Sequence, residues 1–247
     1  MNNSIITLFR FLRLNRNYSL MEKTILKSAS IVNTDQKKIK QIRFLTKSTF
    51  VLTFERDNIQ FFAGQHITIG TSGSLNQREY SVYSGEKQNY LEILVKEVLD
   101  GNVSMQLRNC NPGDLLEVNG PFGSFRLETK NMYSRKHLFI ATGTGISPFH
   151  SMVKTYPGIN YTILHGIRYS DEAYEKNDYE PERYITCTTK ELSSGYNGRV
   201  TGFLSDYLDE PDTVYYLCGN SSMIYEVSDL LRDKGVSGDR VLKEVYF

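Results

Sequence analysis

Residues 137–150 read HLFIATGTGISPFH, which places a hydrophobic run directly before a glycine-rich turn. The run HLFIAT has the length and composition of a buried β-strand. Gly143 and Gly145 allow a tight turn in which the backbone approaches a ligand closely, and Pro148 suits the first turn of a helix. A strand, a turn and a helix in this order are typical of parallel α/β sheets, which bind ligands at the carboxyl ends of their strands.

The sequence after this turn alternates between strands and helices. Further strands are predicted at 159–167, 182–189, 213–219 and 240–247. Helices are predicted at 148–156, 171–177, 201–208 and 221–234. The last helix has one hydrophobic face and ends before Gly235, a common stop signal. This alternation predicts an α/β doubly wound parallel sheet as a domain over residues 135–247.

Residues 22–130 have a different pattern, in which glycine and proline separate short runs of alternating polarity. Strands are predicted at 42–55, 65–70, 78–83, 90–98 and 114–120, and one helix is predicted near 101–109. Short strands with frequent turns are typical of an antiparallel β-barrel. The predicted fold class is therefore a two-domain chain, with a β-barrel domain first and the α/β domain second.

Composition and charge exclude several classes of protein. A formal net charge of +1 over 247 residues argues against a protein that binds nucleic acid. The three cysteines and four histidines are scattered, without the spacing of a zinc or iron–sulfur site, so no metal is predicted. The small odd number of cysteines favours a reducing, cytoplasmic location over a disulfide-bonded secreted protein.

Residues 1–21 need a separate interpretation. They contain ITLFRFLRL and three arginines, and the apolar run is far shorter than the ~20 residues of an integral membrane span. A helix on a membrane surface is one possibility. We expect a disordered extension instead, or a start codon placed upstream of the true one, since the sequence from Met21 onward has ordinary composition.

A first candidate site is the strand segment Arg78-Glu79-Tyr80-Ser81. Arg78 and Tyr80 point to one face of a strand, and Ser81 points to the other. A guanidinium can hold a pyrophosphate, and a tyrosine ring can stack on a flat heterocycle. An arginine and a tyrosine on an edge strand would give the same pattern, so the segment alone is weak evidence.

Three further segments have both a binding and a structural interpretation. A glycine at the start of a helix, as in Gly101-Asn102-Val103-Ser104, suits a phosphate but also an ordinary helix cap. Cys218-Gly219-Asn220 ends a predicted strand and equally describes a buried cysteine and a turn. The segment Glu244-Val245-Tyr246-Phe247 is aromatic, as core strands often are.

In combination, these segments resemble the ferredoxin–NADP reductase superfamily over about residues 25–247. The resemblance lies in their order and approximate spacing: Arg78/Tyr80/Ser81, Gly101/Ser104, Gly143/Thr144/Gly145/Pro148, Cys218/Gly219 and Glu244/Tyr246. An aromatic residue after the last tyrosine, here Phe247, resembles the bacterial subgroup.

The resemblance implies that the barrel holds FAD. By similarity, Arg78 contacts the FAD pyrophosphate, Tyr80 stacks on the isoalloxazine ring and Ser81 lies near its reactive nitrogen. The other FAD-binding residues that it implies are Val82, Tyr83, Lys96, Gly101, Val103, Ser104 and Tyr246.

The resemblance also implies that the α/β domain binds NADP(H). The residues implied for this are Gly143, Thr144, Gly145, Arg168, Lys190, Arg199, Cys218 and Gly219. The implied catalytic residues are Ser81, Cys218, Glu244 and Tyr246, with Tyr246 covering the flavin face where the nicotinamide must bind.

The choice between NADPH and NADH depends on three cations. A 2′-phosphate requires positive charge, whereas a free ribose is usually held by an acid. Two of these cations, Arg168 and Lys190, follow predicted strands, and Arg199 lies in the segment GRVTG. Bacterial NADP-dependent members of the superfamily resemble this chain in having cations at these three places, although they have arginine where this chain has Lys190. Three solvated surface cations are the alternative. We expect NADPH.

The sequence therefore predicts an FAD-dependent oxidoreductase that passes electrons between NADPH and ferredoxin or flavodoxin. Lys37, Lys38, Lys40 and Arg43 form a basic cluster that suits such acidic carriers, although most clusters of this kind are solvated surface. The alternatives are an NAD(P)H–flavin or cytochrome-b-type reductase of the same superfamily, and a non-catalytic binding module that has lost its flavin. We expect a monomer.

Overall fold

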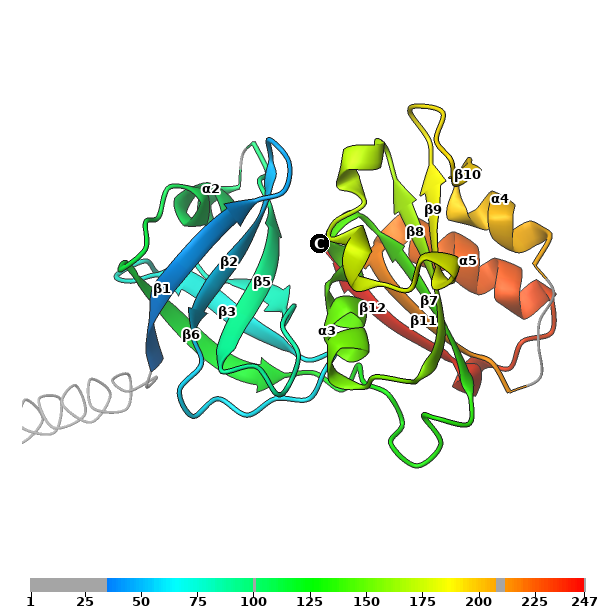
Figure 1. The fold of residues 1–247 in the computed structure, drawn as a ribbon, viewed down its shortest axis with the longest axis horizontal. Helices are drawn as coiled ribbons and strands as arrows, with labels where there is room; N and C mark the ends of the chain where they lie inside the picture. Colours follow the sequence, from blue (N-terminus) through cyan, green and yellow to red (C-terminus); the bar gives the residue numbers. More distant parts are fainter. Residues whose placement is uncertain (1–34, 100, 208–211, 247) are drawn as a thin grey trace, which may run out of the picture. The chain divides into compact units, whose positions relative to one another are not determined.

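The computed structural model describes residues 35–99, 101–207 and 212–246, and it contains two six-stranded sheets (Figure 1). The predictions for residues 1–21 and Phe247 lie outside this part of the chain. None of the helices described there has the length and hydropathy that crossing a membrane requires. The two-domain fold class is confirmed, while the boundary predicted between residues 130 and 135 stays a prediction.

The first sheet is an antiparallel barrel with the strand order β4-β3-β6-β1-β2-β5. An isolated bridge between Val82 and Ile93, directly beyond β4 and inside β5, links its two edges. Its strands are β1 (Asp35–Phe44), β2 (Thr49–Glu55), β3 (His66–Thr71), β4 (Arg78–Ser81), β5 (Tyr90–Lys96) and β6 (Leu115–Phe122).

The prediction of one continuous strand over residues 42–55 is wrong, because the chain reverses between β1 and β2. The turn contains neither glycine nor proline, which is why the sequence did not mark it. Thr46 makes the turn instead, since its Oγ1 accepts hydrogen bonds from the backbone N–H groups of Ser48 and Thr49 at 3.3 and 3.1 Å.

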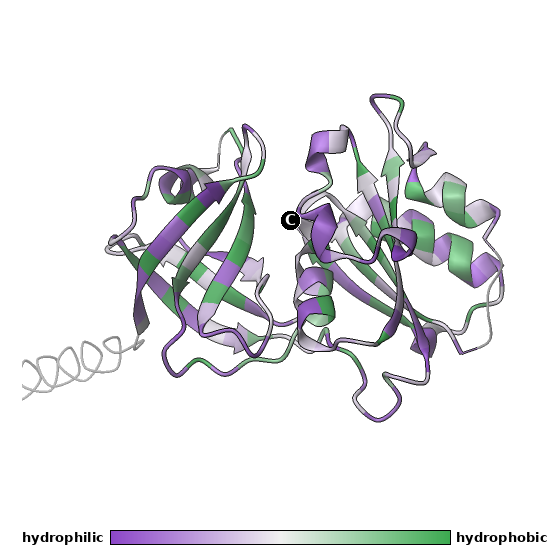
Figure 2. Cartoon of the chain, in the orientation of Figure 1, coloured by the Kyte–Doolittle hydropathy of each residue, from purple (hydrophilic) through white to green (hydrophobic). Residues whose placement is uncertain are grey.

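The barrel has a closed hydrophobic core. Phe50, Leu52 and Phe54 on alternate positions of β2 are fully buried inside it, and Figure 2 shows hydrophobic and hydrophilic bands alternating along the barrel strands. The intervening residue Val51 is also buried, in a second cluster that contains Phe139 of the parallel sheet. The barrel therefore packs directly against the second domain, within one compact unit.

The second sheet is entirely parallel, with the order β10-β9-β8-β7-β11-β12. The chain leaves β7 toward β8 on one side and returns to β11 on the other, so the topological switch point lies at β7. Its strands are β7 (Lys136–Thr142), β8 (Asn160–Ile167), β9 (Tyr184–Thr188), β10 (Tyr196–Asn197), β11 (Val214–Asn220) and β12 (Val241–Tyr246).

Helices cover both faces of this sheet. On one face, Phe149 of α3 (Ser147–Thr155) stacks on Phe139 of β7 at 4.8 Å between ring centroids. On the other face, Leu138 and Ile140 pack against α4 (Val200–Ser205) and α5 (Ser221–Asp233). The alternation of side chains along β7 thus separates the two hydrophobic layers.

Two local predictions in this domain need correction. Residues 171–177 do not form one helix but belong to short 3₁₀ turns at Ser170–Glu172 and Lys176–Asp178, with Glu175 in the left-handed region at φ 47°. The charged segment lacks a helical hydrophobic face, and it is fixed instead by the buried ring of Tyr174. The short edge strand β10 was not predicted, because two residues carry no periodic pattern.

The predicted basic cluster is divided in the structure. Lys37 is 1% exposed and forms an ion pair with Asp57, and Arg43 forms ion pairs with Glu92 and Glu175. Lys40, in contrast, is exposed. The four cations therefore do not form one solvent-facing patch.

Candidate functional site

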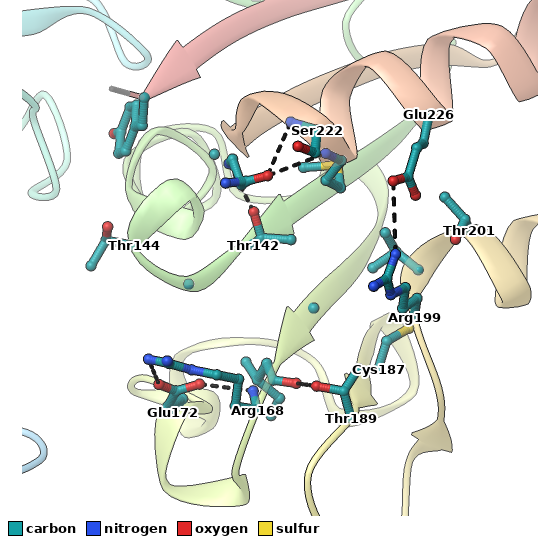
Figure 3. Close-up of a pocket in the computed structure, with 18 of the residues that line it drawn as sticks. Thr142, Thr144, Arg168, Glu172, Cys187, Thr189, Arg199, Thr201, Ser222 and Glu226 are labelled. Atoms are coloured by element: carbon teal, nitrogen blue, oxygen red, sulfur yellow. Dashed lines mark hydrogen bonds and ion pairs between the residues drawn. The ribbon is translucent and has the colours of Figure 1, made fainter.

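A cavity of about 590 Å³ lies where β7, β8 and β11 end (Figure 3). The turn after β7 contributes Thr142, Gly143 and Thr144 to its lining, and Arg168 and Arg199 come from the ends of β8 and the start of α4. This is the place where open parallel sheets bind their ligands. The glycine-rich turn that predicted the fold thus lines a cavity at the carboxyl ends of the parallel strands.

Two glycines allow the backbone to reach this cavity. Gly143 has φ +52°, and the space beside its Cα is open for at least 4 Å. Gly219 has φ +128°, and a Cβ there would lie 2.5 Å from the Thr142 hydroxyl, which accepts a hydrogen bond from the backbone N–H of Asn220. Both positions require glycine, the first for conformation and the second for contact.

Gly145, also predicted to bind NADP(H), lies behind the lining of the cavity. It is buried, and a Cβ there would lie 2.4 Å from the carbonyl oxygen of Cys218. Its glycine lets the 3₁₀ turn Gly143–Ile146 pack against β11. Gly145 therefore supports the lining of the cavity from behind.

Two arginines face the cavity, and each has an acidic partner (Figure 3). Arg168, 56% exposed, lies 3.2 Å from Glu172, and Arg199, 71% exposed, lies 3.7 Å from Glu226. Figure 3 shows the two pairs on separate sides of the opening. The third predicted cation, Lys190, is exposed and does not line the cavity, although its backbone N–H donates to the carbonyl oxygen of Arg168.

Glu172 connects the barrel to this cavity. Its carboxylate accepts hydrogen bonds from Lys96 at the end of β5 and from the side chain and backbone N–H of Arg168. Burial alone would raise the pKa of Glu172, but these donors lower it to about 2. Glu172 is therefore ionised under all ordinary conditions and fixes Lys96 at the rim.

A chain of hydrogen bonds joins the barrel strand β4 to the last strand of the parallel sheet. The Tyr246 hydroxyl donates to Ser81 Oγ at 2.7 Å, and Ser81 Oγ donates to Glu244 Oε2 at 3.1 Å. Glu244 is the register partner of Cys218 across β11 and β12. The four residues predicted to be catalytic thus lie together, although 163 residues separate Ser81 from Glu244.

Burial sets the protonation of this group. It raises the pKa of Glu244, an effect that the hydrogen bond from Ser81 and the nearby His66 partly oppose. It also raises the pKa values of the Tyr246 hydroxyl and the Cys218 thiol well above their usual ranges. Cys218, 0% exposed, therefore remains a neutral thiol and is not a nucleophile.

The sequence did not single out His66, which completes this group. Its Nδ1 lies 3.4 Å from Glu244 Oε1. His66 is the first residue of β3 and pairs with Ser81 in the barrel. No motif marks it, because its importance comes only from a contact with a distant part of the chain.

The predicted FAD-binding residues fall into an exposed and a buried set. Arg78 is exposed and has no carboxylate partner among the residues that the structure describes, and Tyr80 is half-buried, with its pKa raised by burial to about 12. Val82, Tyr83 and Val103, in contrast, are buried in the cores, and the Tyr83 ring stacks on His150. Arg78 and Tyr80 present side-chain surface to a ligand, as do Lys96 and Tyr246, which line the cavity.

The start of α2 (Asn102–Arg108) suits an anion. The backbone N–H groups of the first helical turn have no intrahelical partner, and no described side chain caps them here. They can therefore donate to an anion. The Ser104 hydroxyl does not cap these N–H groups, because it donates to the Gly101 carbonyl oxygen and accepts from the Val98 N–H. Together with the exposed guanidinium of Arg78, which donates to the Gln77 carbonyl oxygen, the barrel therefore carries hydrogen-bond donors that suit an anion.

His165 holds the glycine turn in place. It is fully buried, its Nε2 lies 2.8 Å from the Gly143 carbonyl oxygen, and its Nδ1 lies 2.7 Å from the Tyr184 hydroxyl. Burial lowers the pKa of His165 to about 4, so the ring is neutral, with Nε2 donating and Nδ1 accepting.

This pKa makes folding stability depend on pH. The unfolded chain binds a proton at His165 below about pH 6.5 and the folded protein only below about pH 4, so stability decreases as the pH falls through this window. Between about pH 7 and pH 5, wild type is expected to lose about 2 kcal/mol more unfolding free energy than His165→Gln. Urea unfolding at both pH values measures this, and equal losses would contradict the assignment.

Comparisons with known proteins agree on the family. The family model described as "Oxidoreductase FAD-binding domain" matches residues 20–127, and "Oxidoreductase NAD-binding domain" matches residues 139–229. A ferredoxin–NADP reductase of Azotobacter vinelandii is 29% identical over 74% of this chain and 83% of its own length. An NADH-cytochrome b5 reductase 1 of Lodderomyces elongisporus is 32% identical over 71% of this chain and 65% of its own length.

Other relatives are longer than the matched region. The electron transfer component of toluate 1,2-dioxygenase from Pseudomonas putida is 26% identical over 81% of this chain, which spans 64% of that protein. The chain spans about half to two thirds of the length of several such relatives. A ferredoxin NADP+ reductase from Neisseria gonorrhoeae, solved with FAD and NADP bound, has the same fold, with a TM-score of 0.77, 21% identity, and 86% and 98% of the two chains covered.

Proposed function

Because the chain belongs to the ferredoxin–NADP reductase superfamily of FAD- and NAD(P)-binding oxidoreductases, as the motifs predicted, we propose that it transfers electrons between NADPH and a small carrier protein such as ferredoxin or flavodoxin. The observation that carries this proposal is the hydrogen-bonded group of Ser81, Glu244 and Tyr246 at the edge of the nucleotide cavity. FAD, when bound, supplies the exchange of a hydride for single electrons.

The barrel residues position the flavin nucleotide in this proposal. Arg78 and the uncapped start of α2 at Gly101 bind the phosphates, and Tyr80 packs against the ring system. Val82, Tyr83 and Val103 act through their backbone or through the core that fixes β4 and α2, because their side chains are buried. Lys96 lies at the rim and is oriented by Glu172.

The cavity residues bind the nicotinamide nucleotide. Thr144 and the backbone at Gly143 and Gly219 line its floor, and Arg168 and Arg199 supply the charge that a 2′-phosphate requires. Both guanidinium groups are more than half exposed and remain accessible beside their carboxylate partners. We infer a preference for NADPH from these two arginines.

Tyr246 controls access to the reacting groups. Its ring lines the cavity, and its hydroxyl is held by Ser81, so the nicotinamide reaches Ser81 and Cys218 only after this ring moves. Glu244, with its raised pKa, accepts the Ser81 hydrogen bond and provides a place for a proton beside that hydroxyl. The chain therefore supplies orientation, exclusion of water and proton storage.

An anaerobic absorbance titration of the FAD-loaded protein tests the proposal. NADPH is expected to bleach the flavin band at lower concentration than NADH does. Equal or stronger bleaching by NADH would reject the nucleotide preference but keep the enzyme. A protein that takes up no flavin would overturn the proposed function.

A second candidate function is that of an NADH-dependent reductase serving an oxygenase or a cytochrome. The electron transfer component and the NADH-cytochrome b5 reductase among its relatives suggest this class. The observation that favours it is the carboxylate of Glu226 in the cavity lining, since an acid suits the free ribose hydroxyls of NADH. The titration distinguishes the two nucleotides, and reduction assays with purified ferredoxin, flavodoxin and cytochrome distinguish the carriers.

A further inference from the structure

A second cavity of about 510 Å³ shares no lining residue with the nucleotide cavity. Its lining comes from β1, β2 and β5 of the barrel, from α3 and from the segment around Glu175. Three of its residues, His150, Glu175 and Asp178, are potential metal ligands, and their ligand atoms all lie within 4.8 Å of one another. None of them belongs to the group around Ser81.

The hydrogen bonds of His150 leave one ring nitrogen directed at acids. His150 is 2% exposed, and its Nδ1 lies 2.7 Å from the carbonyl oxygen of Tyr83, so Nδ1 must carry a proton. Its Nε2 lies 2.9 Å from Asp178 Oδ2 and 3.9 Å from Glu175 Oε2. Two carboxylates therefore border the space at Nε2, and their oxygens can bind a metal ion together with this nitrogen.

The surroundings of this nitrogen are those of a metal ligand. A histidine that binds a metal usually donates its other N–H to a carbonyl or a carboxylate, as His150 does to Tyr83. One imidazole nitrogen with two carboxylate oxygens is a ligand set that Zn²⁺ accepts, with a further position left for water. The cavity is open to solvent on this side, since Asp178 is 32% exposed.

An independent feature points to a missing ligand. The Tyr83 ring is 0% exposed and stacks on His150 with 3.8 Å between centroids. Its hydroxyl lies beside the Glu175 carboxylate, yet it makes no hydrogen bond of ordinary geometry to any residue described. A buried hydroxyl without a well-placed partner costs roughly 1–3 kcal/mol, and a metal-bound water beside Glu175 would satisfy it.

The local cations do not prevent binding. Lys154 lies 3.1 Å from Asp178, and Arg43 contacts Glu175. The Lys154 and Arg43 side chains are 37% and 35% exposed, so both can turn toward solvent. Glu92, 8% exposed, adds a third carboxylate to the wall of the cavity. Three acids and one imidazole thus face the same space, together with the side chains of Lys40, Arg43 and Lys154.

We propose that His150, Glu175 and Asp178 form a binding site for a divalent transition-metal ion, represented here by Zn²⁺. The ion is bound by His150 Nε2 and by one oxygen from each carboxylate. It joins helix α3 to the segment around Glu175, next to the barrel residue Tyr83. The expected consequence is a protein that is more stable to heat when the metal is bound.

Calorimetric titration of the FAD-loaded, chelator-treated full chain with ZnCl₂ tests the proposal. A single Zn²⁺ ion is expected to bind with micromolar affinity, and the thermal unfolding midpoint is expected to rise. Asp178→Asn, on the exposed side of the site, is expected to weaken binding about 100-fold without unfolding the protein. His150→Gln is expected to remove binding.

His137→Gln is the matched control. His137 is equally buried and also contacts a backbone carbonyl, that of Met132, but no carboxylate lies in contact with it among the described residues. Its variant is expected to bind Zn²⁺ as wild type does. Absence of binding in wild type, or unchanged binding in both Asp178→Asn and His150→Gln, would overturn the proposal, as would binding that alkylation of the cysteines abolishes.

Discussion

Reduction of the bound flavin by NADPH is expected to slow about 100-fold when Ser81 is replaced by alanine. The Ser81 hydroxyl links Tyr246 to Glu244, because it accepts a hydrogen bond from the first and donates one to the second. Without it, the partly buried Tyr246 hydroxyl and Glu244 carboxylate each lose a partner, and neither is held in its position at the proposed site of reaction. Stopped-flow measurement of flavin bleaching gives the rate.

Ser151→Ala provides the control for this prediction. Ser151 is as buried as Ser81 and also makes one strong hydrogen bond, to the carbonyl oxygen of Ser84, but it lies on α3 outside the group. Its variant is expected to reduce the flavin within about threefold of the wild-type rate, whatever its effect on stability. Equal slowing in both variants would show that Ser81 acts through folding and not through the site.

A double substitution, Arg168→Ala with Arg199→Ala, is expected to raise the Kd for NADPH about 100-fold and to change the Kd for NADH less than about threefold. Each charge-assisted contact to the 2′-phosphate contributes about 1.5 kcal/mol, and two such contacts correspond to this factor. NADH lacks the phosphate, and both arginines are exposed, so the fold does not depend on them.

Arg232→Ala is the matched control for charge. Arg232 is 70% exposed and pairs with Asp229 on α5, as Arg199 pairs with Glu226, but it does not line the cavity. It is expected to leave both dissociation constants unchanged. Equal weakening of NADPH and NADH by the double variant would place the arginines elsewhere on the nucleotide and would favour the NADH-dependent candidate.

The hydrogen-bonded group of Ser81, Glu244 and Tyr246 shows how much of the site could be predicted from the sequence. Ser81, Glu244 and Tyr246 were predicted to act together only because their motifs resembled a family, and the structure brings them into contact. Gly145 and Lys190 were also predicted to bind NADP. In the structure, Gly145 packs against β11, and Lys190 lies outside the cavity lining. A motif specifies which residues occur near a site, whereas side-chain direction depends on packing.

The sequence alone determined the two kinds of sheet and the position of the glycine-rich turn that lines the cavity. Hydrophobic periodicity and glycine turns are local properties, since each depends on residues only a few positions apart. They were misread where a turn used the Thr46 hydroxyl in place of glycine, and where the charged residues 171–177 resembled a helix. In both places, the deciding interaction was a hydrogen bond or a buried ring that the local pattern does not contain.

Only the tertiary structure decided which distant charges meet. The pairing of His66 with Glu244, of Lys96 with Glu172, and of His150 with Asp178 joins segments that no sequence spacing relates. The proposed partners of His150 lie on a separate loop, so the spacing of the histidines in the sequence does not indicate them. Long-range contacts arise when two hydrophobic layers pack, and that packing fixes the pKa values and the partners of the polar groups at their edges.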